Sequence, residues 1–105
     1  MTHPTAADKR LVRAQRREER RRIAAARDLD ADGPRLAAHV LDLLDRLGIG
    51  AGATVTAYES TPIEPPTADL VATLAARDVR VLVPITLPDL DLDWCDAGDP
   101  GRTPL

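Results

Sequence analysis

Tyr58, Glu59 and Glu64 place an aromatic ring and two carboxylates in one proline-punctuated loop, "AYESTPIEP" at residues 57–65. The loop follows a β-branched stretch that predicts a strand, and ligands of open α/β sheets bind beyond the carboxyl ends of the strands. We therefore expect a ligand-binding site in this loop. The alternative is a rigid surface turn in which Tyr58 packs against the end of the strand and both glutamates are solvated.

A βαβ unit is expected to position this loop. Branched residues predict strands at 55–58 and 79–84, and Thr67 is placed to cap a helix over 68–77 between them. Two strands joined by a helix within so short a span form a right-handed unit with parallel strands. We assign residues 53–84 to this unit.

The flanking segments are a basic arm, a second helix and a tail. Residues 1–28 are rich in Arg, Ala and Glu and predict a helical arm whose apolar stripe is thin, so this helix needs a neighbour. Pro34 is placed in the first turn of a second helix, 34–48, which ends at Gly48 as its C-terminal cap. The proline-rich segment 85–105 predicts a loop-rich tail with room for one short edge strand. The whole chain is thus expected to be one α/β domain.

Composition narrows the class of protein. The chain has 105 residues, enough for one small domain, but no Phe, one Trp and one Tyr, so its core must rest on aliphatic side chains. The single cysteine, Cys95, cannot form an internal disulfide, and no Cys/His spacing suits zinc, so we expect no metal site of protein ligands. No apolar run has the length of a signal peptide or a membrane span, which predicts a cytoplasmic protein.

Charge is distributed unevenly along the chain. Residues 1–27 carry nine basic and three acidic side chains, a net charge of +6, whereas the remainder carries −9 and the whole chain −3. Such an arm either binds an anionic partner or lies against the acidic body.

Three motifs in this order resemble the N-terminal half of 5-formyltetrahydrofolate cyclo-ligase, also called 5,10-methenyltetrahydrofolate synthetase. "DKRLVR" supplies Lys9 and Arg13 as K-x-x-x-R, and "AYESTPIEP" supplies an aromatic residue followed six positions later by Glu. "VLVPITLPDLDLDW" follows at the expected distance, so the resemblance extends from about Asp8 to Trp94. The fold it implies is a Rossmann-like three-layer domain, of which this chain is an apparently truncated N-terminal part.

The resemblance implies ATP-dependent conversion of 5-formyltetrahydrofolate to 5,10-methenyltetrahydrofolate in folate one-carbon metabolism. Lys9 and Arg13 would bind the phosphates of Mg²⁺-ATP, since residues four apart share a helix face. Glu64 would accept hydrogen bonds from the pterin, and Tyr58 and Glu59 would wall the folate pocket. Glu59 departs from the family, in which an apolar residue usually follows the aromatic one. No catalytic residue is assigned.

A glycine-rich phosphate loop that belongs to the C-terminal half of this family does not occur in the sequence. "GIGAG" at 48–52 cannot replace it, because it follows a helix and precedes a strand, whereas a phosphate cradle needs amides at a helix N-terminus. We therefore expect the chain alone to be inactive. Its unpaired strand edge and uncovered Leu and Val surface predict self-association or partial unfolding, although the full-length enzyme would be a monomer. A truncated remnant with no activity is the alternative.

Other functions are disfavoured. An arginine-rich arm could bind nucleic acid or the ribosome, but the body is acidic and no aromatic side chain interrupts the basic run to stack on bases. Asp89, Asp91 and Asp93 imitate an EF-hand, yet its sixth and twelfth positions are Trp94 and Pro100, which excludes calcium. His39, on or beside an apolar helix face, is interpreted as a packing or boundary residue, and Cys95 as an inert thiol.

Overall fold

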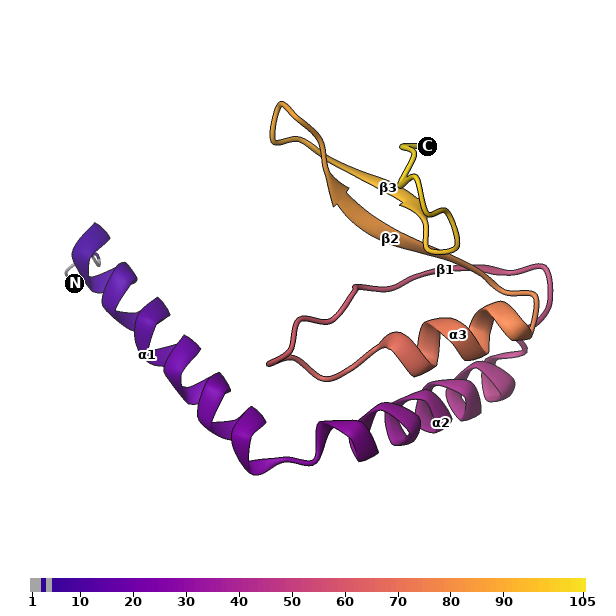
Figure 1. Ribbon diagram of the computed structural model, residues 1–105, viewed down its shortest axis with the longest axis horizontal. Helices are drawn as coiled ribbons and strands as arrows, with labels where there is room; N and C mark the ends of the chain where they lie inside the picture. Colours follow the sequence, from indigo (N-terminus) through magenta and orange to yellow (C-terminus); the bar gives the residue numbers. More distant parts are fainter. Residues whose placement is uncertain (1–2, 4) are drawn as a thin grey trace.

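The computed structural model describes residue 3 and residues 5–105 of the chain. Within them it is a mixed α/β structure in which three helices accompany a three-stranded sheet of order β1-β2-β3 (Figure 1). In chain order the elements are α1 (Ala6–Ala26), α2 (Leu29–Leu47), β1 (Thr54–Thr56), α3 (Ala68–Ala76), β2 (Arg80–Thr86) and β3 (Leu92–Asp96).

The predicted parallel βαβ unit is confirmed. Strand β1 pairs in parallel with β2, with Thr54 opposite Arg80 and Thr56 opposite Leu82. Strand β2 runs past its predicted end at Pro84 to Thr86, because it pairs there with β3. Pro84 faces β1, as does Leu82, whose O accepts a hydrogen bond from Ala57 N at 2.9 Å. At that point β1 has ended, so the missing N–H of proline costs no ladder bond.

The predicted boundary between the first two helices was wrong. Helix α2 begins at Leu29, with Asp28 as N-cap accepting a hydrogen bond from Ala31 N at 3.2 Å, and Pro34 lies inside the helix. The Asp28 cap and the acidic first turn favour helix there, and the guanidinium of Arg27 is held by Asp32 at 2.6 and 2.8 Å. These contacts outweigh the one helical bond that proline removes.

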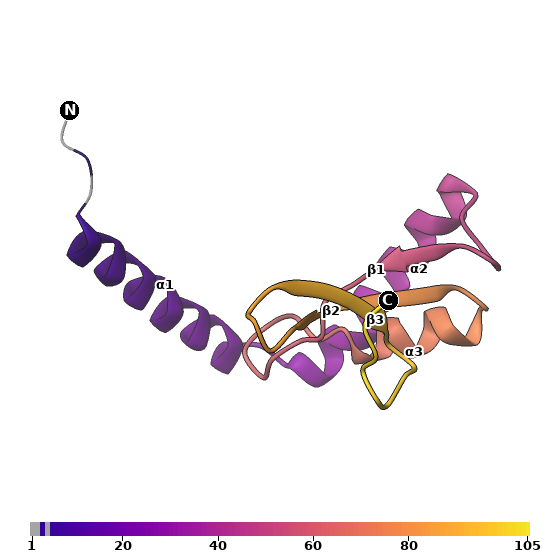
Figure 2. The same ribbon diagram turned by 90° about the horizontal axis from the view of Figure 1, so that it is seen from above.

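The core lies between the sheet and one layer of helices. Helix α3 packs on the sheet and α2 packs on α3, and Figure 1 shows both helices on the same side of the strands. The buried apolar side chains are Ala37, Leu70, Leu74, Val79, Val81, Val83 and Cys95. In contrast, α1 extends away from this body in both views (Figures 1 and 2), and none of its side chains from Ala6 to Ala26 is buried.

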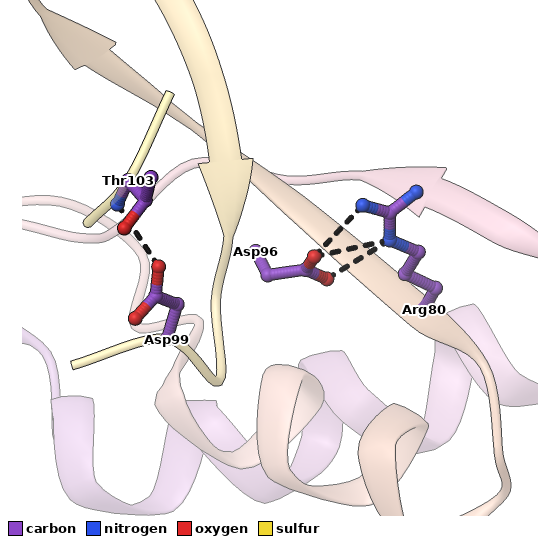
Figure 3. A network of polar contacts seen from close by, with 4 residues as sticks. All are labelled: Arg80, Asp96, Asp99 and Thr103. Carbon is purple, nitrogen blue, oxygen red and sulfur yellow. Dashed lines mark hydrogen bonds and ion pairs between the residues drawn. The ribbon is translucent and has the colours of Figure 1, made fainter. Parts of the chain in front are cut away.

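The tail contains the expected edge strand and is tied down by polar contacts. Strand β3 pairs antiparallel to β2, and Arg80 donates to the carboxylate of Asp96 at 2.8 and 3.0 Å. Asp99 accepts hydrogen bonds from Gly101 N and Thr103 N at 2.9 and 3.0 Å; Figure 3 shows Arg80 turned toward Asp96 and Asp99 toward Thr103. The segment after β3 is therefore an ordered turn.

No helix among the described residues is both long enough and apolar enough to cross a bilayer.

Candidate functional site

The loop after β1 is closed by hydrogen bonds between its two ends. Thr67 Oγ1 donates to Tyr58 O at 2.7 Å, Ser60 N donates to Thr67 Oγ1 at 3.2 Å, and Thr67 N donates to Ser60 Oγ at 3.1 Å. Thr67 is N-cap of α3 by position, but its side chain makes no capping bond to the helix, so the predicted capping role was wrong. Its hydroxyl instead joins the two ends of the loop, and Thr67 itself is buried.

Tyr58 and Glu64 brace the interior of this loop. The Tyr58 hydroxyl donates to Pro65 O at 2.9 Å, while the ring remains 41% exposed. Glu64 N donates to Thr61 O at 3.1 Å and Thr61 N donates to Glu64 Oε1 at 2.8 Å, which closes a tight turn. The carboxylate of Glu64 is thus held in place through one of its two oxygens.

Hydrogen bonding also favours the ionised form of Glu64. The Thr61 N–H that donates to its carboxylate lowers the pKa of Glu64 below its ordinary value, and the charge of Arg20 on α1 acts more weakly in the same direction. Glu64 therefore stays an acceptor at neutral pH. The C-terminal end of α1 approaches the loop, since Ile23 lines a groove together with Ile63 and Pro65.

Glu59 makes a contact that no sequence pattern indicates. Its Oε2 accepts a hydrogen bond from Arg102 Nη2 at 2.6 Å, and Arg102 Nη1 lies 4.0 Å from the Sγ of Cys95. The Cys95 thiol and the Glu59 carboxylate both raise the pKa of Arg102. Arg102 is 43 residues from Glu59 in sequence, and no local motif marked it. Cys95 is fully buried.

A groove of about 370 Å³ lies where the end of α1, the start of α2 and the loop meet. Its apolar lining residues are Ile23, Ala24, Leu29, Leu36, Ile63, Pro65 and Pro66, and its polar ones are Arg27, Asp32, Arg35 and His39. Glu64 lines a neighbouring depression of about 340 Å³ that shares Leu29 and Pro66 with the groove. Three separate segments build this groove, so sequence inspection missed it.

Lys9 and Arg13 lie away from that groove. Both are exposed on α1, where they line a shallow depression with Asp8 and Val12. At 1.5 Å per residue, the helix carries Lys9 about 20 Å along its axis from Ile23, the first α1 residue in the groove. The expectation that Lys9 and Arg13 share a helix face is confirmed, but the structure does not bring them together with Tyr58, Glu59 or Glu64.

Metal ligation was tested by geometry. In the part of the chain that the structure describes, no group of three or more His, Cys, Asp or Glu side chains is arranged to hold a metal ion. Glu59 and Glu64 in the loop and Asp99 in the tail accept hydrogen bonds from protein donors.

Comparison of the chain with protein-family models, with curated proteins and with solved structures gave no match. The functional argument therefore rests on the residues and on their geometry.

Proposed function

We propose that this chain provides the N-terminal half of the site of a 5-formyltetrahydrofolate cyclo-ligase, an enzyme that uses ATP and Mg²⁺ to form 5,10-methenyltetrahydrofolate. The observation that carries the proposal is the braced loop at the carboxyl end of β1, which holds an ionised Glu64 next to a largely apolar groove. This is the location at which open α/β sheets bind ligands.

The groove matches the chemistry of a reduced folate. A pterin is flat and carries several N–H donors, which suits the apolar walls formed by Ile63 and Pro65 and a fixed carboxylate acceptor at Glu64. A folate also ends in glutamyl carboxylates, and Arg35 on the rim of the groove offers a positive charge. Tyr58 supports the loop through its hydroxyl and leaves part of its ring available as a wall.

The proposed reaction needs stabilisation of phosphate charge. The formyl oxygen of 5-formyltetrahydrofolate attacks the terminal phosphorus of ATP and releases ADP. The second folate nitrogen then attacks the activated formyl carbon, closes the ring and expels phosphate. Charge spreads over the phosphoryl oxygens in the first step, and Lys9, Arg13 and Mg²⁺ would stabilise it.

We further propose that the site is completed by residues outside these 105. Lys9 and Arg13 are distant from the groove, and the sequence has no glycine-rich loop to enclose phosphates. Helices α2 and α3 lie on one face of the sheet (Figure 1), which is compatible with a Rossmann-like three-layer domain whose second helical layer comes from the same additional segment.

Replacement of Glu64 tests the folate contact. Glu64→Gln retains an oxygen for the N–H of Thr61, so the turn should persist, but the ligand loses a charged acceptor. A charge-assisted hydrogen bond contributes about 1.5–3 kcal/mol, so we expect the affinity for 5-formyltetrahydrofolate to fall about tenfold or more. Titration calorimetry with the chain measures it. Glu18→Gln, on the exposed surface of α1, is the charge-matched control, and equal affinity of the Glu64 variant and the control would contradict the assignment.

Replacement of Lys9 or Arg13 tests the nucleotide contact. In an enzyme that joins this chain to the family's C-terminal half, Lys9→Ala and Arg13→Ala should each raise the KM for ATP about tenfold or more, because a charge-assisted phosphate contact is lost. The KM for the folate should change little. Arg17→Ala on the same helix is the control. An unchanged ATP dependence in both variants would show that these side chains are merely solvated charges.

A further inference from the structure

The face of the sheet that points away from α3 exposes large apolar side chains. Val81, Val83 and Cys95 point into the core, so the alternation of strand residues turns their neighbours to the opposite face, which we call the open sheet face: Leu82, Pro84, Leu92 and Trp94. The register pairs Pro84 with Trp94. Leu92 is 75% exposed and Trp94 41% exposed. Contiguous apolar side chains of this size on one face mark an interaction surface.

Among the described residues, the part of helix α1 before Ile23 is the second surface without a packing partner, since Ile23 already lines the groove against α2 and the loop. Leu11 and Val12 are 59% and 51% exposed and adjoin one another on one side of the helix. With 3.6 residues per turn, Glu19 and Arg22 lie between Leu11 and Ile23 on that side, so the apolar stripe consists of Leu11 and Val12. A helix in water gains most of its stability from packing an apolar stripe. Helix α1 would therefore be stabilised by packing on an apolar surface, and the open sheet face is an apolar surface that nothing in the described residues covers.

We propose that α1 of one copy docks on the open sheet face of a second copy, and that the exchange is reciprocal, so that two chains form a symmetric dimer. Charge selects this arrangement. Residues 1–27 carry +6 and the remainder −9, and Asp89 and Asp91 are exposed at the hairpin end of the open sheet face. Packing two open sheet faces on one another would bring like charges together, whereas the arm brings opposite charge.

The connection between the helices favours docking of an arm from another copy. Only Arg27 and Asp28 separate α1 from α2, and the ion pair between Arg27 and Asp32 at 2.6 Å braces that junction. Helix α2 lies on the covered side of the sheet, and α1 leaves the body from there (Figures 1 and 2). In both views (Figures 1 and 2) α1 extends to the side of the body and does not lie over the open sheet face of its own chain. Because each copy offers both surfaces, reciprocal docking closes as a two-fold dimer.

The proposed full-length enzyme would cover the same sheet face with its second helical layer, so the dimer is a property of the 105-residue chain and does not depend on the proposed activity.

Trp94 is the single tryptophan of the chain and lies on the open sheet face, so its fluorescence reports docking. We expect sedimentation equilibrium to give a dimer, and the Trp94 emission to shift to shorter wavelength as protein concentration rises. Raising salt from about 0.1 M to about 1 M shortens the Debye length from about 10 Å to about 3 Å and should weaken the dimer. A chain that is monomeric at every concentration would overturn the proposal.

Two variants and their mixture separate reciprocal exchange from other modes of association. The double variant Leu11→Gln with Val12→Gln removes the apolar stripe of α1. Leu92→Lys places a positive charge on the open sheet face, which repels the positively charged α1 of the other copy. Each change should weaken the dimer about tenfold or more. All three positions are exposed, so folding should persist, which circular dichroism checks. Leu47→Gln, at the exposed end of α2, should leave the dimer intact.

The mixture is decisive, because the Leu92→Lys chain has an intact α1 and the stripe variant has an intact open sheet face. At a concentration at which each variant alone is monomeric, mixing the two in equal amounts should leave one of the two contacts intact and give a heterodimer. A dimer that the stripe variant leaves unchanged would show that the sheet faces pack on each other, and a mixture that stays monomeric would exclude arm exchange.

Discussion

The 105-residue chain, incubated with 5-formyltetrahydrofolate and Mg²⁺-ATP, should form no 5,10-methenyltetrahydrofolate above the uncatalysed rate. Lys9 lies about 20 Å along α1 from the groove that we propose for the folate, so the terminal phosphate and the formyl oxygen cannot both be held in contact. Phosphoryl transfer depends almost wholly on positioning and on fixed charge around the phosphates. Absorbance of the methenyl product follows the reaction directly.

A full-length cyclo-ligase under the same conditions is the control for this experiment. Adding a separately expressed C-terminal half, which carries the glycine-rich loop, should restore measurable turnover if the two halves associate. Turnover by the chain alone at a rate near that of the full-length control would contradict the proposed division of the site. It would mean that α1 moves to bring Lys9 and Arg13 to the groove, or that other residues hold the nucleotide.

Local sequence signals predicted the elements that position the loop. Branched residues predicted β1 and β2. Gly48 was predicted as the C-terminal cap of α2, and it ends that helix in a left-handed conformation with a φ of 71°, which glycine adopts without strain. The start of α2 was mispredicted because two local signals compete there. Pro34 suits a first turn, but the Asp28 cap and the Arg27–Asp32 ion pair begin the helix earlier, and only the folded chain shows which wins.

Contacts between distant residues could not be predicted. Thr67 follows a loop and precedes a helix, which indicates a cap, yet its hydroxyl bonds to Tyr58 O across the loop. The partner of Glu59 is Arg102, and nothing near either residue marks the pair. The groove needs α1, α2 and the loop together. The roles of Lys9, Arg13, Tyr58, Glu59 and Glu64 toward ATP and folate stay predictions.

Leu74→Ala should remove a large part of the free energy of unfolding. Leu74 is 1% exposed in α3, where it packs with the buried residues of β2, and its carbonyl accepts hydrogen bonds from Arg77 N and Val79 N at 3.0 Å each. Truncating a fully buried leucine costs about 2–5 kcal/mol, because the lost apolar contact leaves a cavity.

The effect is large relative to the stability available. A domain of this length has a free energy of unfolding of about 5–15 kcal/mol. We expect this chain to lie near the lower end of that range, because its core has no Phe and consists of seven buried side chains around α3 and the sheet. Urea unfolding followed by circular dichroism, at one fixed protein concentration because dimerisation would add to stability, measures the difference. Leu47→Ala, at a position 62% exposed on α2, should change stability by less than about 0.5 kcal/mol. A loss below about 1 kcal/mol at Leu74 would mean that α3 does not unfold together with the sheet, and that the loop it anchors through Thr67 is held by other contacts.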